Sequence, residues 1–420
     1  MTTHANDYTY PLGLFDAFGI ELEYMIVDRD TLDVRPVCDE LFAAKAGKPV
    51  SDLEPDGPDG AVSWSNELAL HVVELKTQRP TPSLDHIHED FQRHVRAIDE
   101  LLEPMNCRLM PGGVHPWMDP QRETRLWPHE YNDVYRAYDR IFGCKGHGWG
   151  NLQSTHINLP FANDDEFGRL HAALRIVLPL LPALAASSPI IDGDWSPIAD
   201  HRLEVYRSNA KRVPSMTGLV VPEPVFTRAQ YERDILGRLY DDLAPLDPEG
   251  VLRHEFANAR GAMARFDRGA IEIRVLDIQE CPKADLAIAN LIVAVVRAIV
   301  DERWTTHDHQ KTIRTEPLHD TLLDTIRYAE RTRITDHTLL ECFGFTQSVV
   351  WAGDLWTALL EQTLPDHPLW TPILRSMLRS GTLATRLGRR IRRFPTQHEL
   401  VDLYRELADS LHAGELFRVA

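Results

Sequence analysis

Four segments of the sequence alternate between apolar and polar residues with a period of two, which indicates β-strands with one buried face. They are FGIELEYMIVD, NELALHVVELKT, QSTHINLPF and AIEIRVLDI, and each carries carboxylate, imidazole or guanidinium groups. Side chains two positions apart on a strand lie on the same face of the sheet. Several acids on one face need cations to neutralise them. The pattern therefore predicts one site, built on a sheet, that holds divalent metal ions and a phosphorylated group.

The acids of the first two segments are candidate metal ligands. Glu21 and Glu23 share a face and could bind two neighbouring ions. Glu67 and Glu74 differ in strand parity, so both reach one site only if a bulge or a turn lies between them. Mg²⁺ and Mn²⁺ prefer oxygen ligands, and a neutral His156 suits Mn²⁺ better than Mg²⁺.

The same alternation also describes an ordinary antiparallel sheet with one solvated face, and a single pair of acids would favour that interpretation. Arg274 is either a substrate clamp or a cross-strand partner of Glu21 or Glu23. The sequence has no GxxxxGK[ST] loop, so other groups must bind phosphates. The candidates are Arg202, Arg207, Lys211, Arg260 and Arg265. Each of these could equally form a surface ion pair.

Composition narrows the class of protein. The 420 residues suit one large α+β domain or two smaller ones, and the 43% hydrophobic and 26% charged residues are ordinary for globular proteins. A net charge of −18 argues against a general nucleic-acid binder. The five scattered cysteines favour a reducing cytoplasm over a disulfide framework. We find no secretion signal and no apolar run long enough for a bilayer, so we expect a soluble cytoplasmic protein with no membrane partner.

The sequence predicts a mixed sheet-and-helix catalytic domain over residues 1–303 and a helical region over 304–420 that packs on the same domain. The strands are expected at 18–28, 61–64, 69–77, 108–111, 152–160 and 270–278. The helices are expected at 82–103, 164–186, 227–243, 282–302, 317–331, 335–343, 346–362, 372–380 and 396–412. The helix over 164–186 contains prolines that should kink it. Residues 112–150 are interpreted as a long functional loop, and strand signals disappear after about residue 307.

Six motifs occur in the order found in the glutamate–cysteine ligase-like carboxylate–amine ligases, which the chain resembles from about residue 17 to about residue 300. They are GIELEYMIVD, NELALHVVELKTQRP, PGGVHPWMDP, NLQSTHINLPF, LAASSPIIDG with HRLEVYR, and ARFDRGAIEIRVLD. The resemblance implies a curved antiparallel sheet related to that of glutamine synthetase, with helices packed outside. It also implies a reaction in which ATP phosphorylates a substrate carboxylate and an amine then displaces phosphate to form an amide.

The resemblance assigns roles to residues of this chain. The metal-binding positions of the family match Glu21, Glu23, Glu67, Glu74, His156 and Glu272. Arg274 matches an arginine near the transferred phosphate or the substrate carboxylate. We take Arg274, Arg265 and Glu74 as catalytic candidates, and Arg202, Arg207, Lys211 and Arg260 as ATP-binding candidates. The implied partners are a glutamate-like carboxylate, an amine and ATP with Mg²⁺ or Mn²⁺; a homo-oligomer is compatible with the sequence.

Two points depart from the family or stay open. Asn158 stands where many bacterial members have a second histidine, so contacts on that strand can differ. Nothing in the sequence marks a pocket for cysteine as the amine. Two rival functions remain at this stage: a metal-dependent guanidino or small-molecule kinase, and a non-catalytic scaffold that binds ATP and metal.

Three further features allow two interpretations each. Trp127 and Trp149 either cover the site or anchor the core. The serines of AASSP either contact substrate or close a helix. Arg386, Arg389, Arg390 and Arg393 form a basic helical face that either binds phosphates or an acidic partner, or lies in solvent paired with acids elsewhere.

Overall fold

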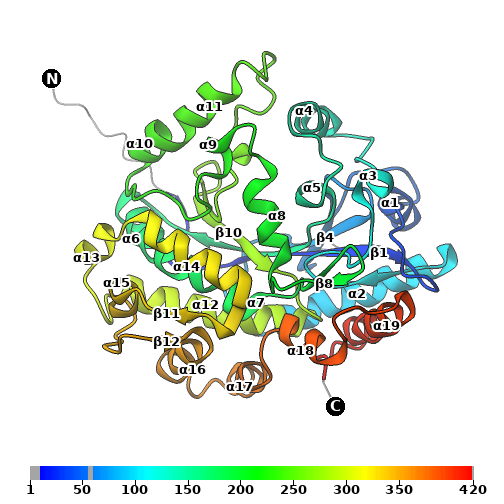
Figure 1. The fold of residues 1–420 in the computed structure, drawn as a ribbon. Coiled ribbons are helices and arrows are strands. Elements are labelled where there is room, and N and C mark those ends of the chain that lie inside the picture. Colours follow the sequence, from blue (N-terminus) through cyan, green and yellow to red (C-terminus); the bar gives the residue numbers. More distant parts are fainter. Residues whose placement is uncertain (1–9, 55–59, 419–420) are drawn as a thin grey trace.

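An antiparallel sheet forms the centre of the fold (Figure 1). The computed structural model describes residues 10–54 and 60–418. The sheet has eight strands in the order β2-β3-β4-β1-β6-β10-β9, with β5 paired to the second half of β1. The strands are β1 (Gly19–Asp28), β2 (Asp52–Leu53), β3 (Val62–Asn66), β4 (Val72–Thr77), β5 (Cys107–Met110), β6 (Ser154–Pro160), β9 (Ala262–Arg265) and β10 (Ala270–Asp277). The predicted α+β class with an antiparallel sheet is confirmed.

One face of this sheet is apolar and is covered by helices. Ile20, Leu22 and Tyr24 of β1 are fully buried in the same core as α2 (Ile87–Leu102) and α12 (Pro282–Val300), which lie below the sheet in Figure 1. Helix α2 buries Ile87, Phe91, Val95, Ile98 and Leu102 along one side. Because strand side chains alternate, the acids between the apolar residues of β1 point to the other face.

The remaining helices surround the sheet. In the first half they are α1 (Cys38–Ala46), α3 (Pro120–Glu123), α4 (Asn132–Phe142), α5 (His147–Gly150), α6 (Asp164–Val177), α7 (Pro182–Ala185), α8 (His201–Asn209), α9 (Pro214–Thr217), α10 (Arg228–Tyr231) and α11 (Arg238–Leu243). Towards the C-terminus they are α13 (His307–Thr312), α14 (Thr315–Tyr328), α15 (His337–Glu341), α16 (Ala352–Thr363), α17 (Trp370–Ser380), α18 (Leu383–Arg390) and α19 (Gln397–Ala413).

Several boundaries differ from the sequence predictions. The helix expected over 164–186 breaks at its prolines into α6, a 3₁₀ turn (Leu178–Leu180) and α7. The segment 112–150 is not one loop, because it contains α3, α4 and α5. Strands do recur after residue 307, as the short pair β11 (Arg333–Ile334) and β12 (Val350–Trp351); two-residue strands leave no detectable periodicity. Helix α18 carries Arg386, Arg389 and Arg390 of the predicted basic helical face.

The C-terminal helices pack on the sheet domain. Helices α16 and α17 contact α12, and α19 contacts α2 and β5. The indole of Trp356 on α16 donates to the carbonyl of Leu180 over 2.9 Å. Helices α16 and α17 share the main hydrophobic core with the sheet, and α19 packs mostly in a second core with Met25, Val27 and Met110. The division near residue 303 stays a prediction.

Candidate active site

The acids predicted from strand parity come together on one face of the central strands. Pairing of β1 with β4 sets Glu23 opposite Glu74, and pairing of β1 with β6 sets Glu21 opposite His156. Glu272 on β10 lies opposite Asn158 on β6. The register of three strand pairs thus collects these groups in one place.

Two groups of these side chains have the spacing of metal ligands. Glu21, His156 and Glu272 form one group, and Glu23, Glu74 and His156 form the other; within each group the candidate ligand atoms lie within 4.8 Å of one another. His156 joins the two groups. Its Nδ1 lies 2.8 Å from Glu21 Oε2, and its Nε2 lies 2.9 Å from the Ser154 hydroxyl.

Hydrogen bonds from neighbouring strands hold the carboxylates in place. The backbone N–H and the hydroxyl of Ser154 donate to Glu23 over 2.7 and 2.8 Å. Asn158 donates to Glu21 over 3.0 Å, so it supports that carboxylate. The Ser65 hydroxyl donates to Glu74 over 2.5 Å. Such bonds fix the orientation of carboxylates that would bind a metal ion.

Glu67 reaches the same site from a turn. Strand β3 ends at Asn66 and β4 begins at Val72, so a turn lies between Glu67 and Glu74, as their opposite parity required. Glu67 is outside the two ligand groups formed by the described residues. Its side chain faces the junction of two cavities.

Burial and the charges of neighbouring groups shift the pKa values of several side chains in the site. Burial, followed by the charges of Glu23 and Glu74, raises the pKa of Glu67 well above its ordinary value. Burial and the charge of Glu21 raise the pKa of Glu74 to about 7. Burial lowers the pKa of His156, but its hydrogen bond to Glu21 and the charges of Glu23, Glu21 and Glu272 together outweigh burial and raise that pKa to about 9.

This donor set fits divalent cations. Carboxylate oxygens with one imidazole are ligands of Mg²⁺ and Mn²⁺, and a bound cation would favour the charged forms of Glu67 and Glu74, which burial disfavours.

Four cationic side chains border the acids: Arg268, which lines both cavities, and Arg274, Arg265 and Lys76. Arg274 donates to Glu272, its neighbour on the same face of β10, over 3.0 Å. Neither Glu21 nor Glu23 is within ion-pair distance of it among the described residues. Arg265 lies 3.8 Å from Glu272 and is also bonded to Asp267. Lys76 contacts Glu74 at 3.3 Å. The arrangement sets cations next to the acids, as binding of a polyphosphate requires.

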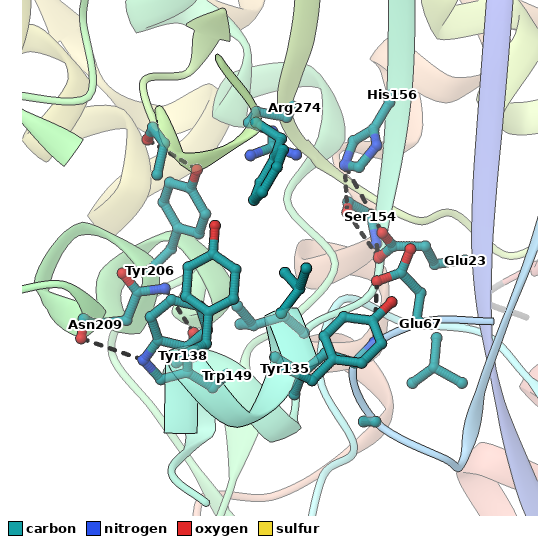
Figure 2. A pocket seen from close by; sticks show the side chains of 18 of the residues that line it. Glu23, Glu67, Tyr135, Tyr138, Trp149, Ser154, His156, Tyr206, Asn209 and Arg274 are labelled. Carbon is teal, nitrogen blue, oxygen red and sulfur yellow. Dashed lines mark hydrogen bonds and ion pairs between the residues drawn. The ribbon is translucent and has the colours of Figure 1, made fainter. Parts of the chain in front are cut away.

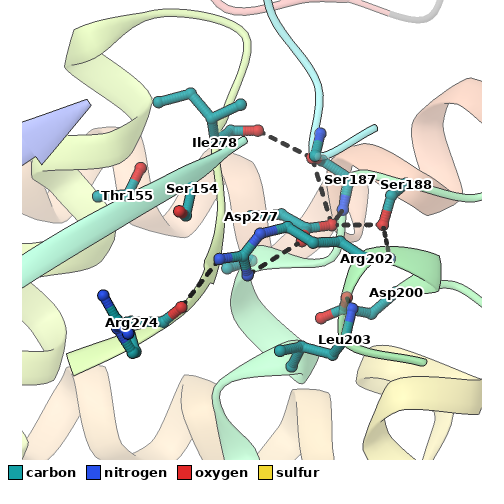
Figure 3. Close-up of polar contacts among 12 residues, drawn as sticks. Ser154, Thr155, Ser187, Ser188, Asp200, Arg202, Leu203, Arg274, Asp277 and Ile278 are labelled. Atoms are coloured by element: carbon teal, nitrogen blue, oxygen red, sulfur yellow. Dashed lines mark hydrogen bonds and ion pairs between the residues drawn. The ribbon is translucent and has the colours of Figure 1, made fainter. Parts of the chain in front are cut away.

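Arg202 lies behind Arg274 (Figure 3). A register shift between Ile273 and Leu276 marks a bulge in β10. Arg202 is 2% exposed, and its Nη2 donates over 2.9 Å to the carbonyl of Arg274 within this bulge. Its Nη1 lies 3.8 Å from Asp277. Arg202 therefore supports the backbone that aims Arg274.

The other ATP-binding candidates lie elsewhere. Arg207 is exposed and paired with Glu204 at 2.6 Å, and Lys211 is exposed. Arg260 is buried and makes two bonds of 2.6 Å to Glu223. None of the three is among the described residues that line the two cavities of the site. Their spacing in the sequence gave no information on their partners.

Two cavities meet at the acids. We call the first the acid chamber; it has a volume of about 670 Å³ and contains Glu21, Glu74, Lys76 and Glu272. We call the second the aromatic chamber; it has a volume of about 610 Å³, and its walls carry Tyr135, Tyr138, Trp149 and Tyr206 (Figure 2). Both chambers share Glu23, Glu67, His156, Arg265, Arg268 and Arg274.

Some of these residues escaped the sequence analysis. Ser154 and Lys76 lie two positions from His156 and Glu74, so strand parity could have found them. Arg268 and the tyrosines come from a turn and from helices without such a signal. Of the two tryptophans, Trp149 lines the aromatic chamber and Trp127 is fully buried in the core.

Two other features of the sequence, the serines of AASSP and the basic helical face, have structural roles. Ser187 and Ser188 donate to Asp277, which lies beside Arg202 (Figure 3). Arg386 is buried in an ion pair with Glu280, whereas Arg390 is exposed and pairs with Glu406. Two of the four arginines are thus paired with acids of this chain, and Arg386 is not in solvent. Arg389 donates to the carbonyl of Ser380, and Arg393 lies over the ring of Phe394.

The comparisons place the chain among the carboxylate–amine ligases, enzymes that join a carboxylate to an amine. The chain belongs to glutamate-cysteine ligase family 2 (GCS2), whose family model matches residues 17–406. The resemblance seen in the motifs is thereby confirmed.

Three known proteins illustrate the similarity. An uncharacterised protein of Archaeoglobus fulgidus is 38% identical over 285 residues, which cover 68% of this chain and 75% of that protein. A putative glutamate–cysteine ligase 2 of Jannaschia sp. is 23% identical over 300 residues, covering 69% of this chain and 70% of the relative. The crystal structure of a bifunctional glutathione synthetase from Pasteurella multocida superposes with a TM-score of 0.60 at 15% identity; the match covers 95% of this chain and 53% of that longer chain, and shows the fold alone.

Proposed function

We propose that the enzyme uses ATP to join a glutamate-like carboxylate to an amine through an acyl phosphate. The observation that carries the proposal is the convergence of Glu21, Glu23, Glu74, His156 and Glu272 beside Arg274 in the acid chamber. Phosphoryl transfer depends mainly on positioning and on charge neutralisation, and this chamber offers both.

The reaction has two steps. An oxygen of the substrate carboxylate attacks the γ-phosphorus of ATP, the bond to the bridging oxygen breaks, and ADP leaves with that electron pair. The amine nitrogen then attacks the acyl carbon and forms the C–N bond. The C–O bond to phosphate breaks, phosphate leaves with the electron pair, and the nitrogen releases a proton to solvent.

The residues of the chain have distinct tasks in these steps. Arg274 and Arg265, at the border of both chambers, neutralise charge on the transferred phosphoryl group. Mg²⁺ or Mn²⁺ would be held by the two ligand groups, one of which includes Glu74, and would withdraw charge from the phosphate oxygens. Arg202 keeps Arg274 aimed at the junction through the carbonyl of the bulge.

Isotope transfer tests the acyl phosphate directly. Glutamate labelled with ¹⁸O in its side-chain carboxylate, incubated with ATP, Mg²⁺ and a panel of amines, should transfer one ¹⁸O to the released phosphate. Amide formation with unlabelled phosphate would contradict the mechanism. A phosphorylated product without amide would instead indicate a kinase, and stabilisation by ATP without any ADP would indicate a scaffold.

The cellular location of the enzyme is part of the proposal. The expected cytoplasmic location is supported by the use of ATP and by five buried, free cysteines. None of the helices in the described ranges is long and apolar enough to cross a membrane. A homo-oligomer stays a prediction.

A further inference from the structure

The aromatic chamber differs chemically from the acid chamber. Except for Arg202, its charged residues lie where the two chambers meet, next to Glu67 and Arg274. The other walls are mainly aromatic and aliphatic, with Tyr135, Tyr138, Trp149 and Tyr206 from α4, α5 and α8 beside the polar Asn209 (Figure 2). A cavity of about 610 Å³ with such walls and a few polar groups at one end suits a ligand with an apolar body and one polar group.

The aromatic wall is rigid and preformed. The ring centroid of Trp149 lies 5.3 Å from that of Tyr138 and 5.4 Å from that of Phe142. The indole of Trp149 donates to the carbonyl of Asn209 over 3.2 Å, and Asn209 donates to the carbonyl of Gly148 over 2.7 Å. A side chain at position 148 would come within 2.7 Å of Asn209, so glycine permits this close approach of α5 to α8. A preformed wall loses little entropy when a ring binds to it.

The junction end offers counter-charge for an amine. Glu67 lines both chambers and forms no ion pair with another described residue. Tyr135, whose hydroxyl accepts from Asn66 over 3.0 Å, also lines this chamber. At this end Glu67 would accept a proton from the ammonium group, which leaves a neutral amine whose nitrogen faces the acids and Arg274, where the phosphate is transferred.

We propose that the aromatic chamber binds the amine substrate, and that this substrate is a primary amine carrying an aromatic ring. The inference rests on the proposed ligase function and adds the class of the amine. A small amine such as cysteine would leave most of the aromatic wall without contact. The nucleotide occupies the acid chamber, because its phosphates must lie among Lys76, Arg265 and the ligand groups.

The test compares amines of different size on the full chain with ATP, Mg²⁺ and glutamate. 2-Phenylethylamine should give a kcat/KM about tenfold to a hundredfold above those of ethylamine and L-cysteine, because burial of a phenyl ring contributes that much to binding. The matched variants are Val134→Trp, which fills the chamber from α4, and Arg136→Trp, which adds the same side chain on an exposed position of that helix.

Val134→Trp should lower kcat/KM for 2-phenylethylamine at least tenfold and change that for ethylamine less than twofold, while Arg136→Trp changes neither. Equal or better turnover of ethylamine and cysteine would overturn the assignment of the amine. If Val134→Trp selectively raised the KM for ATP or for glutamate, the aromatic chamber would bind that substrate instead of the amine. This result would also overturn the assignment of the amine.

A binding measurement separates this proposal from the ligase function. Titration calorimetry should detect 2-phenylethylamine on the unmodified protein and not on Val134→Trp. Binding without amine-dependent ADP release would refute the ligase function and leave the chamber as an aromatic amine site. ADP release with small amines, without binding of 2-phenylethylamine, would refute the chamber assignment alone.

Discussion

The ion pair between Arg386 and Glu280 connects α18 to the segment between β10 and α12. The guanidinium contacts the two carboxylate oxygens at 2.5 and 3.1 Å and also donates to the carbonyl of Phe417 over 2.8 Å. Glu280 is fully buried and Arg386 is 3% exposed. Arg386→Met removes the cation and leaves the carboxylate buried without a partner, which is strongly unfavourable.

The loss of stability in Arg386→Met can be calculated from the proton that Glu280 must take up. Without its partner, Glu280 must be protonated to stay buried. A glutamate in a model peptide has a pKa of about 4.3, so its protonation at pH 7 costs about 2.7 pH units at about 1.36 kcal/mol each, or about 3.7 kcal/mol. At pH 5 the same cost falls to about 1 kcal/mol, because the unfolded chain is then closer to protonation.

Urea unfolding followed by circular dichroism at pH 7 and pH 5 measures this effect. Arg386→Met should lose about 3.7 kcal/mol at pH 7 and about 1 kcal/mol at pH 5. The double variant with Glu280→Met should recover most of the loss, since two apolar groups can replace a buried pair. The control Arg390→Met, which breaks an exposed pair with Glu406, should change stability by less than about 1 kcal/mol. A loss below about 1 kcal/mol at pH 7, or equal losses at the two pH values, would refute the reasoning.

Four further outcomes are expected. Arg274→Lys should lower kcat about a hundredfold or more, measured as ADP release, because it removes directed charge from the phosphoryl group; an unchanged kcat contradicts that role. Arg202→Lys should lower kcat about tenfold at unchanged Mn²⁺ affinity, because the bulge shifts; equal loss of Mn²⁺ affinity would mean general damage. Saturating Mn²⁺, at about a hundredfold its Kd, should stabilise the protein by about 2.7 kcal/mol in thermal unfolding, and Glu74→Gln should remove most of this gain. Burial lowers the pKa of His171 to about 3, so the folded state excludes a proton that the unfolded state binds below about pH 6.5. Stability should therefore fall as the pH drops, by about 2 kcal/mol at pH 5 from this residue, and urea unfolding of His171→Phe should lack that part of the loss.

The sequence alone determined which residues form the faces of the sheet. A period of two in β1 and β10 is set by the backbone, so the shared face of Glu21 and Glu23, and of Glu272 and Arg274, followed from local geometry. The ordered motifs indicated the family because each is a continuous stretch of sequence that can be recognised without knowledge of its contacts.

Only the tertiary structure decided which of these groups meet. The register that sets Glu23 opposite Glu74 depends on pairing between distant segments, and a shift of one residue would turn either side chain to the other face. The role of each arginine likewise depends on the group that it contacts in the folded chain. Arg202 supports a bulge 72 residues away, and Arg386 is buried against an acid 106 residues away. The aromatic chamber is assembled from α4, α5, α8 and several loops whose sequences carry no common signal, because a cavity is a property of packing and not of any one segment.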